Sequence, residues 1–99
     1  MTKVSLFVEL KAKAGKEEAV AQFLASAQTL VATEAGTTAW FAARFDKNTF
    51  AIFDAFENEA GRDAHLNGAV AAALMAHAEE LLAVAPVIRK ANVLANKLP

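Results

Sequence analysis

Residues 3–13 alternate between apolar and polar side chains, and a different periodicity follows Gly15. In the first segment one face carries Val4, Leu6, Val8 and Leu10, and the other carries Ser5, Phe7, Glu9 and Lys11. A period of two predicts a β-strand. From Val20 to Val31 the apolar residues instead fall at helical spacing, with Glu17 and Glu18 where acidic side chains suit the positive end of a helix. This pattern predicts a helix from about residue 16 that ends near Gly36.

The second half of the chain predicts a hairpin, two helices and a final strand. Residues 37–46 and 49–57 are rich in aromatic side chains and are separated by a short polar turn. Asn58 is a suitable N-cap for a short helix to Leu66, and a further helix is expected over 69–83. Pro86 ends that helix, and 87–95 forms the last strand. The order β-α-β-β-α-β predicts an α+β, ferredoxin-like fold with a four-stranded antiparallel sheet and helices on one face.

The aromatic hairpin allows a hypothesis about the uncovered face of the sheet. If Asp46 sits opposite Thr49, one face carries Trp40, Arg44 and Phe53, and the other carries Phe41, Phe45, Phe50, Asp54 and Phe56. An uncovered face with Phe7, Trp40 and Phe53 would be an apolar patch that soluble monomers rarely expose. We therefore expect a homodimer with sheets packed face to face, and Arg44 near the interface, paired with Glu9.

The amino-acid composition argues against several classes of function. The 99 residues are expected to form one domain, residues 1–99, with a net charge of -1 and no basic block, which disfavours nucleic-acid binding. The absence of Cys excludes disulfides, thiolate metal sites and Cys nucleophiles. No apolar run reaches the roughly 18 residues of a membrane span. The N-terminus is typical of a strand rather than a signal peptide, so we expect a cytoplasmic protein without a membrane partner.

Three stretches of the chain resemble one known family. They are VELKAKAGKEEAVAQFL, EAGTTAWFAARFD and FDAFENEAGRDAHL, the last ending in Ala64-His65-Leu66. The chain resembles the antibiotic biosynthesis monooxygenase domain over nearly its whole length. The resemblance implies a dimeric α+β barrel that oxidises polycyclic phenols or quinols with molecular oxygen. It implies no flavin or metal, because the electron-rich substrate anion reduces oxygen itself in an apolar pocket with an aligned proton acceptor.

The resemblance also suggests residues for the site. His65 falls on the family's histidine and Asp54 on its usual acidic position, so both are candidate catalytic residues. The candidate substrate-binding residues are Phe41, Phe45, Phe56, Val8 and Leu74. Val8 replaces a frequent Asn, and Leu74 replaces the haem-ligand His of a haem-degrading branch. Haem chemistry is therefore not expected, and no cofactor or metal is predicted.

Each candidate residue also has a structural interpretation. His65 is either a base beside a phenol or a hydrogen-bonding residue that holds a helix to the sheet. Asp54 is either a catalytic carboxylate or an acceptor for His65 or a backbone N–H. Trp40 and Arg44 could stack on and pair with an anionic aromatic ligand, or anchor the dimer interface with Phe7 and Phe53. The Phe cluster could be core rather than pocket.

Two functions from different classes remain open. The first is a cofactor-independent monooxygenase acting on a quinol or phenol, which the His65 and Asp54 pair favours. The second is a non-catalytic homodimer that binds a small aromatic metabolite, which the apolar Val8 favours. His77 lies beside Glu79 and Glu80 and is expected to be solvated, and its spacing from His65 is not a zinc motif.

Overall fold

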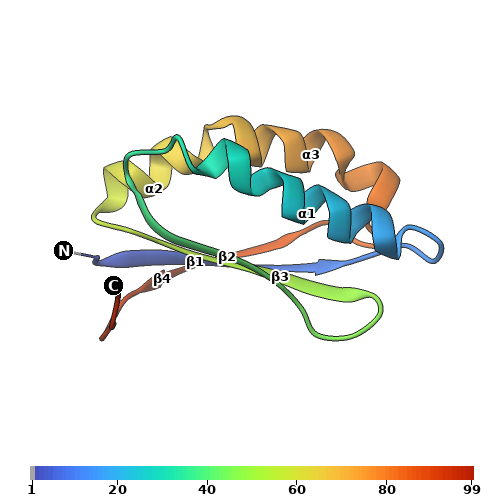
Figure 1. The fold of residues 1–99 in the computed structure, drawn as a ribbon, viewed down its shortest axis with the longest axis horizontal. Coiled ribbons are helices and arrows are strands. Elements are labelled where there is room, and N and C mark those ends of the chain that lie inside the picture. Colours follow the sequence, from blue (N-terminus) through green and yellow to red (C-terminus); the bar gives the residue numbers. More distant parts are fainter. Residues whose placement is uncertain (1) are drawn as a thin grey trace.

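Helices cover one face of a four-stranded antiparallel sheet in the computed structural model, which describes residues 2–99 (Figure 1). Along the chain the elements are β1 (Val4–Lys11), α1 (Glu17–Val31), β2 (Thr37–Arg44), β3 (Thr49–Phe56), α2 (Glu59–Leu66), α3 (Ala69–Leu81) and β4 (Val87–Asn92). The strand order across the sheet is β2-β3-β1-β4. The predicted ferredoxin-like α+β fold is confirmed, with two helices in the second crossover.

Local signals set most of the element boundaries. Gly15 adopts a φ of 85°, a left-handed conformation that favours glycine, and turns the chain from β1 towards α1. The side chain of Asn58 accepts a hydrogen bond from the backbone N–H of Gly61, which confirms the predicted N-cap of α2. The first helix ends at Val31, earlier than predicted, and turns connect it to β2. The last strand ends at Asn92 rather than near residue 95.

The core lies between the helices and the covered face of the sheet. The alternation in β1 turns Leu6, Val8 and Leu10 towards the helices, where all three are buried. The main buried cluster combines these strand positions with helix residues: Val8, Leu10, Ala12, Val20, Leu24, Phe50, Ile52, Leu74 and Leu82. A smaller cluster under α2 contains Val4, Leu6 and the fully buried Phe56. Burial of each Val, Leu, Ile or Phe side chain in these two clusters contributes about 1.5–3 kcal/mol to the stability of the fold.

The observed register of the hairpin differs by one residue from the predicted one. Trp40 lies opposite Asp54, and Phe41 lies opposite Phe53. The turn is one residue longer than assumed, because the backbone N–H of Phe45 donates to the carbonyl of Thr49. The Asp46 side chain accepts from the backbone N–H of Asn48 inside this turn, instead of lying opposite Thr49. A shift of one residue exchanges the faces of every β2 side chain relative to β3.

The register corrects the predicted positions of Trp40 and Arg44. Both lie on the helix-covered face of β2, because their partners Asp54 and Phe50 face the helices. Arg44 does not pair with Glu9, because its guanidinium meets Glu18 of α1 at 2.8 Å and lies over the Phe50 ring. The hydrogen bond between them raises the pKa of Arg44 and lowers that of Glu18. These two residues therefore join β2 to the helical layer.

The open face of the sheet, on the side away from the helices, carries four phenylalanines. Phe7, Phe53 and Phe41 lie side by side across β1, β3 and β2. The exposed fractions of Phe53, Phe41 and Phe45 are 42%, 59% and 63%. The prediction that Phe7 and Phe53 lie on an exposed apolar face is confirmed. Within residues 2–99, no helix has the length and hydropathy required to cross a membrane.

Candidate active site

A buried histidine between two carboxylates is the most unusual polar feature of the covered face. His65 lies in the last turn of α2 and is 6% exposed. Its Nδ1 is 2.5 Å from Oε1 of Glu34, and its Nε2 is 2.9 Å from Oδ2 of Asp54. Glu34 comes from the turn after α1 and Asp54 from the second half of β3. Three separate elements therefore meet at one imidazole, and we call these residues the His65 cluster.

Asp54 is the more deeply buried of the two carboxylates. It is 1% exposed and faces the helices from a strand whose neighbouring positions are apolar. Its contact with Nε2 is short, but neither of its oxygens receives a well-aligned hydrogen bond from residues 2–99. Trp40 lies opposite Asp54 in the sheet, and its buried Nε1–H also lacks an acceptor. Polar groups left in this state carry a free-energy cost that a polar ligand could remove.

The surroundings of His65 favour its charged form. Burial acts to lower the pKa of His65, but the nearby carboxylates of Asp54 and Glu34 outweigh burial and raise that pKa. The position of His65 in the last turn of α2 also favours a cation, because the carbonyl end of a helix is negative. The Phe56 ring lies 5.3 Å from the imidazole, between centroids, and forms an apolar wall. The two carboxylates therefore stabilise the imidazolium form of His65.

Close packing of two glycines brings Glu34 to His65. A Cβ atom on Gly36 would lie 3.0 Å from the Cα of Gly61, so the turn after α1 touches the backbone of α2. Thr37 then donates its hydroxyl to Oε1 of Glu34 at 2.7 Å. The sequence reasoning missed Glu34, because the residue lies in an irregular turn and no spacing relates it to His65. Two signals were available: Glu34 begins the family-like stretch EAGTTAWFAARFD, and the two glycines that bring it to α2 are distant in sequence.

Two cavities border the His65 cluster. The first, about 190 Å³, lies between the turn after α1, α2 and the start of α3, and both Glu34 and His65 line it. The second, about 260 Å³, lies between the end of α1 and β2, and Glu34, Thr37 and Trp40 are among its lining residues. Glu34 therefore borders both cavities, and its side chain is 18% exposed. The cluster is accessible to a small ligand at the Glu34 side.

The structure divides the predicted pocket residues into three groups. Phe56 contacts His65 from beneath α2. Val8 and Leu74 pack in the main core cluster. Phe41 and Phe45 lie on the opposite side of the sheet, because the observed register turns them to the open face. The predicted placement of Phe41 and Phe45 on the same face of the sheet as Asp54 is therefore wrong.

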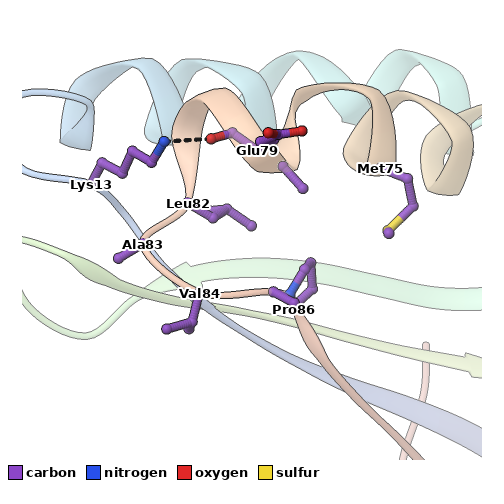
Figure 2. A pocket seen from close by; sticks show the side chains of 9 residues that line it. Lys13, Met75, Glu79, Leu82, Ala83, Val84 and Pro86 are labelled. Carbon is purple, nitrogen blue, oxygen red and sulfur yellow. Dashed lines mark hydrogen bonds between the residues drawn. The ribbon is translucent and has the colours of Figure 1, made fainter.

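A larger hollow occurs at the other end of α3 and contains none of the predicted site residues (Figure 2). Its volume is about 460 Å³, and mainly apolar side chains line it, among them Met75, Leu82, Val84 and Pro86. Lys13 donates its ammonium to the backbone carbonyl of Glu79 at 2.5 Å. This hydrogen bond caps the end of α3. It also engages the ammonium group of Lys13, which lies at the rim of the hollow.

The second histidine, His77, lies outside the His65 cluster. His77 is half exposed, 3.8 Å from Glu80 and beside the ring of Phe23, in agreement with its predicted solvated position. Within the described part of the chain, no group of three or more His, Cys, Asp or Glu residues could hold a metal ion. In the His65 cluster the carboxylates of Glu34 and Asp54 contact the imidazole of His65 on its two sides.

Comparison with solved structures identifies relatives of this architecture. No family model and no curated protein matches the chain. The NE2512 protein of unknown function from Nitrosomonas europaea is 61% identical, with a TM-score of 0.98 over 100% of this chain and 96% of that chain. PA3566 from Pseudomonas aeruginosa is 23% identical, with a TM-score of 0.82 over 96% and 97% of the two chains.

A third relative is described by an activity. A "putative antibiotic biosynthesis monooxygenase" from Nitrosomonas europaea is 16% identical, with a TM-score of 0.83 over 93% of this chain and 90% of that chain. At this identity the likeness concerns the fold. The chain therefore belongs to the family of the NE2512 protein, and its fold is that of the antibiotic biosynthesis monooxygenase-like proteins.

Proposed function

We propose that this chain is a monooxygenase that oxidises a phenol or quinol with molecular oxygen and needs no bound cofactor. The observation that carries the proposal is the buried His65 between Asp54 and Glu34, bordered by a cavity. Buried titratable groups with opposing charge partners in a cavity are typical of sites that transfer protons. The shared fold with monooxygenase-like proteins supports the same reaction class.

The reaction requires the protein to remove a proton and to stabilise an anion. Loss of the phenolic proton makes the ring electron-rich enough to reduce oxygen. One oxygen atom replaces a ring hydrogen to form a quinone, and the other leaves as water, so atoms and electrons balance. With two carboxylates and one imidazolium, the His65 cluster can accept one proton without becoming positively charged. Asp54 orients the imidazole, and the imidazolium stabilises the anionic ring.

Oxygen uptake by the purified protein with a panel of quinols and phenols tests this function. His65→Ala and Asp54→Asn should reduce uptake by roughly 10²-fold or more, since positioned proton transfer contributes about that factor. His77→Ala is the matched control and should retain full activity. The proposal fails if no substrate is consumed above its spontaneous rate, or if folded His65→Ala consumes oxygen as fast as the unchanged protein.

A second function is favoured by a different observation. Both ring nitrogens of His65 are occupied, and Val8 and Leu74 fill the core. These features would suit a non-catalytic module that binds a small aromatic metabolite, in which His65 only fastens α2 to the sheet. In that case the panel would contain ligands that bind without oxygen uptake, and His65→Ala would lower stability alone.

We also propose that the protein is a homodimer joined through the open face. Phe7, Phe41, Phe45 and Phe53 would be covered there by the same face of a second copy. Phe53→Glu should convert the dimer to monomers in sedimentation velocity, because it would bury like charges next to the two-fold axis. Leu30→Glu alters an equally exposed apolar residue on α1 and should leave the dimer intact. A monomeric unchanged protein would refute the interface.

A further inference from the structure

The geometry of the His65 cluster leaves one carboxylate oxygen available to a ligand. His65 Nδ1 and Thr37 Oγ1 both donate to Oε1 of Glu34, at 2.5 and 2.7 Å. The other oxygen, Oε2, has no hydrogen-bond partner among residues 2–99 and lies near Gly68 at the start of α3, where an added Cβ would be 3.5 Å away. His65 itself has both nitrogens engaged and is 6% exposed. Glu34 is therefore better placed than His65 to meet a substrate hydroxyl.

The adjacent cavity limits what that substrate can be. Its volume is about 190 Å³. A cavity of roughly 150 Å³ holds a benzene molecule, and sites for drug-sized ligands begin near 300 Å³. Its lining contains Leu30 and several small residues, namely Ala35, Gly36, Gly61, Ala64, Gly68 and Ala69. The space suits one substituted ring better than a polycyclic compound.

We propose that Glu34 is the proton-accepting residue of the site, through Oε2, and that the substrate is a hydroxylated compound with a single aromatic ring. This inference rests on the proposed function for its context, but it concerns which residue receives the proton and which ligands fit. His65 and Thr37 are then positioning residues that hold Oε1 and direct Oε2 towards the cavity.

The proton transfer balances within the cluster. The O–H bond of the phenol breaks, its electron pair stays on the phenolate oxygen, and a new O–H bond forms at Oε2 of Glu34. One negative charge moves from Glu34 to the ring, and the imidazolium of His65 remains in place. The start of α3 next to the cavity favours negative charge on the ligand, because the amino end of a helix is positive. The ionised ring is thereby stabilised without a change in total charge.

Binding of 4-nitrophenol tests the inference, because its phenolate is coloured and its phenol form is not. Below the ordinary pKa of the probe, the unchanged protein should bind it with a shift towards the coloured form. Glu34→Gln should still bind the probe but should lose this shift. Glu80→Gln, on an exposed turn of α3, is the matched control and should keep it.

A second variant tests the cavity without altering the carboxylate. Ala64 lines the cavity from an exposed position on α2, so Ala64→Leu should fill it while the helix still forms. We expect binding of 4-nitrophenol to weaken about tenfold or more, because the leucine side chain would occupy the space that the ring needs. 1-Anthrol, a three-ring phenol, should not bind to the unchanged protein.

The inference is overturned if the unchanged protein does not bind 4-nitrophenol, if Glu34→Gln ionises it equally, if Ala64→Leu binds it equally, or if 1-anthrol binds as well as 4-nitrophenol. Oxygen uptake is measured separately on the same preparations. Ionisation of the probe without uptake of oxygen from any substrate would leave the role of Glu34 standing and would refute the monooxygenase.

Discussion

Both faces of the sheet carry phenylalanines, but the surroundings of these rings differ. On the covered face Phe50 and Phe56 are 1% and 0% exposed, whereas Phe41 and Phe45 on the open face are 59% and 63% exposed. Neighbouring residues of the same type therefore contribute very differently to the stability of a single chain. The comparison shows that burial depends on what packs against a face, and that the helices provide this for one face only.

The faces differ again in where polar groups lie. On the covered side Asp54 and the α2 residue His65 are buried among apolar side chains, whereas Glu9 and Lys11 on the open face are exposed. Buried charges are costly unless they are paired, and here Glu34 reaches in from a turn to complete the pairing. The covered face thus combines most of the folding energy with the candidate chemistry.

The largest expected difference between the faces is in the cost of removing a ring. Phe56→Ala should lower the free energy of unfolding by about 3–5 kcal/mol, because it leaves a cavity in a fully buried cluster. Phe41→Ala should change that free energy by less than about 1 kcal/mol when the chain is diluted to monomers, because its ring is already largely in water. Urea denaturation at low protein concentration measures both values. Equal losses would contradict the asymmetry.

A smaller effect is expected where the turn after α1 contacts α2. In Gly61→Ala the new Cβ would lie 3.0 Å from the carbonyl oxygen of Gly36, so the backbone must shift. We expect a loss of about 1–3 kcal/mol in urea denaturation, typical of overpacking, together with loss of the Glu34 contact to His65. Gly15→Ala would not serve as a control, because its positive φ adds strain of its own. Ala60→Ser, at an exposed position on the same helix, is the control and should change little.

The smallest expected effect is the pH dependence of stability that His65 contributes. Because folding raises the pKa of His65, its contribution is fully present below the unfolded value of about 6.5 and is lost as the pH rises through the folded pKa. The stability difference between the unchanged protein and His65→Gln should therefore shrink from pH 6 towards pH 9. His77→Gln is the control. A difference that stays constant or grows with pH would show that His65 is neutral in the folded protein.

Local patterns in the sequence were sufficient for the fold. The alternation in residues 3–13, the helical stripe after Gly15 and the Asn58 cap each correspond to an observed element. Such signals are local, and their periodicity is set by the geometry of the backbone. The contact between Asp54 and His65 agrees with one of the interpretations of Asp54, as an acceptor for His65, and both residues were selected through the family resemblance.

The errors arose where the outcome depends on turns. The side chain of Asp46 stabilises a hairpin loop that is one residue longer than predicted. This one-residue difference in loop length places Trp40 on the covered face and Phe41 on the open face. Glu34 joined the cluster only through a contact between distant glycines. Neither outcome has a periodic signature, because each depends on the conformation of a few irregular residues.

The central claim is that His65 is a buried imidazolium held between Glu34 and Asp54. Nitrogen NMR of the labelled histidine side chains at neutral pH tests it most directly, with Glu34→Gln as the comparison. The account predicts that both ring nitrogens of His65 carry protons, and that Glu34→Gln lowers the pH at which one of them is lost. A neutral imidazole with one bare nitrogen at pH 7, unchanged in Glu34→Gln, would contradict the account.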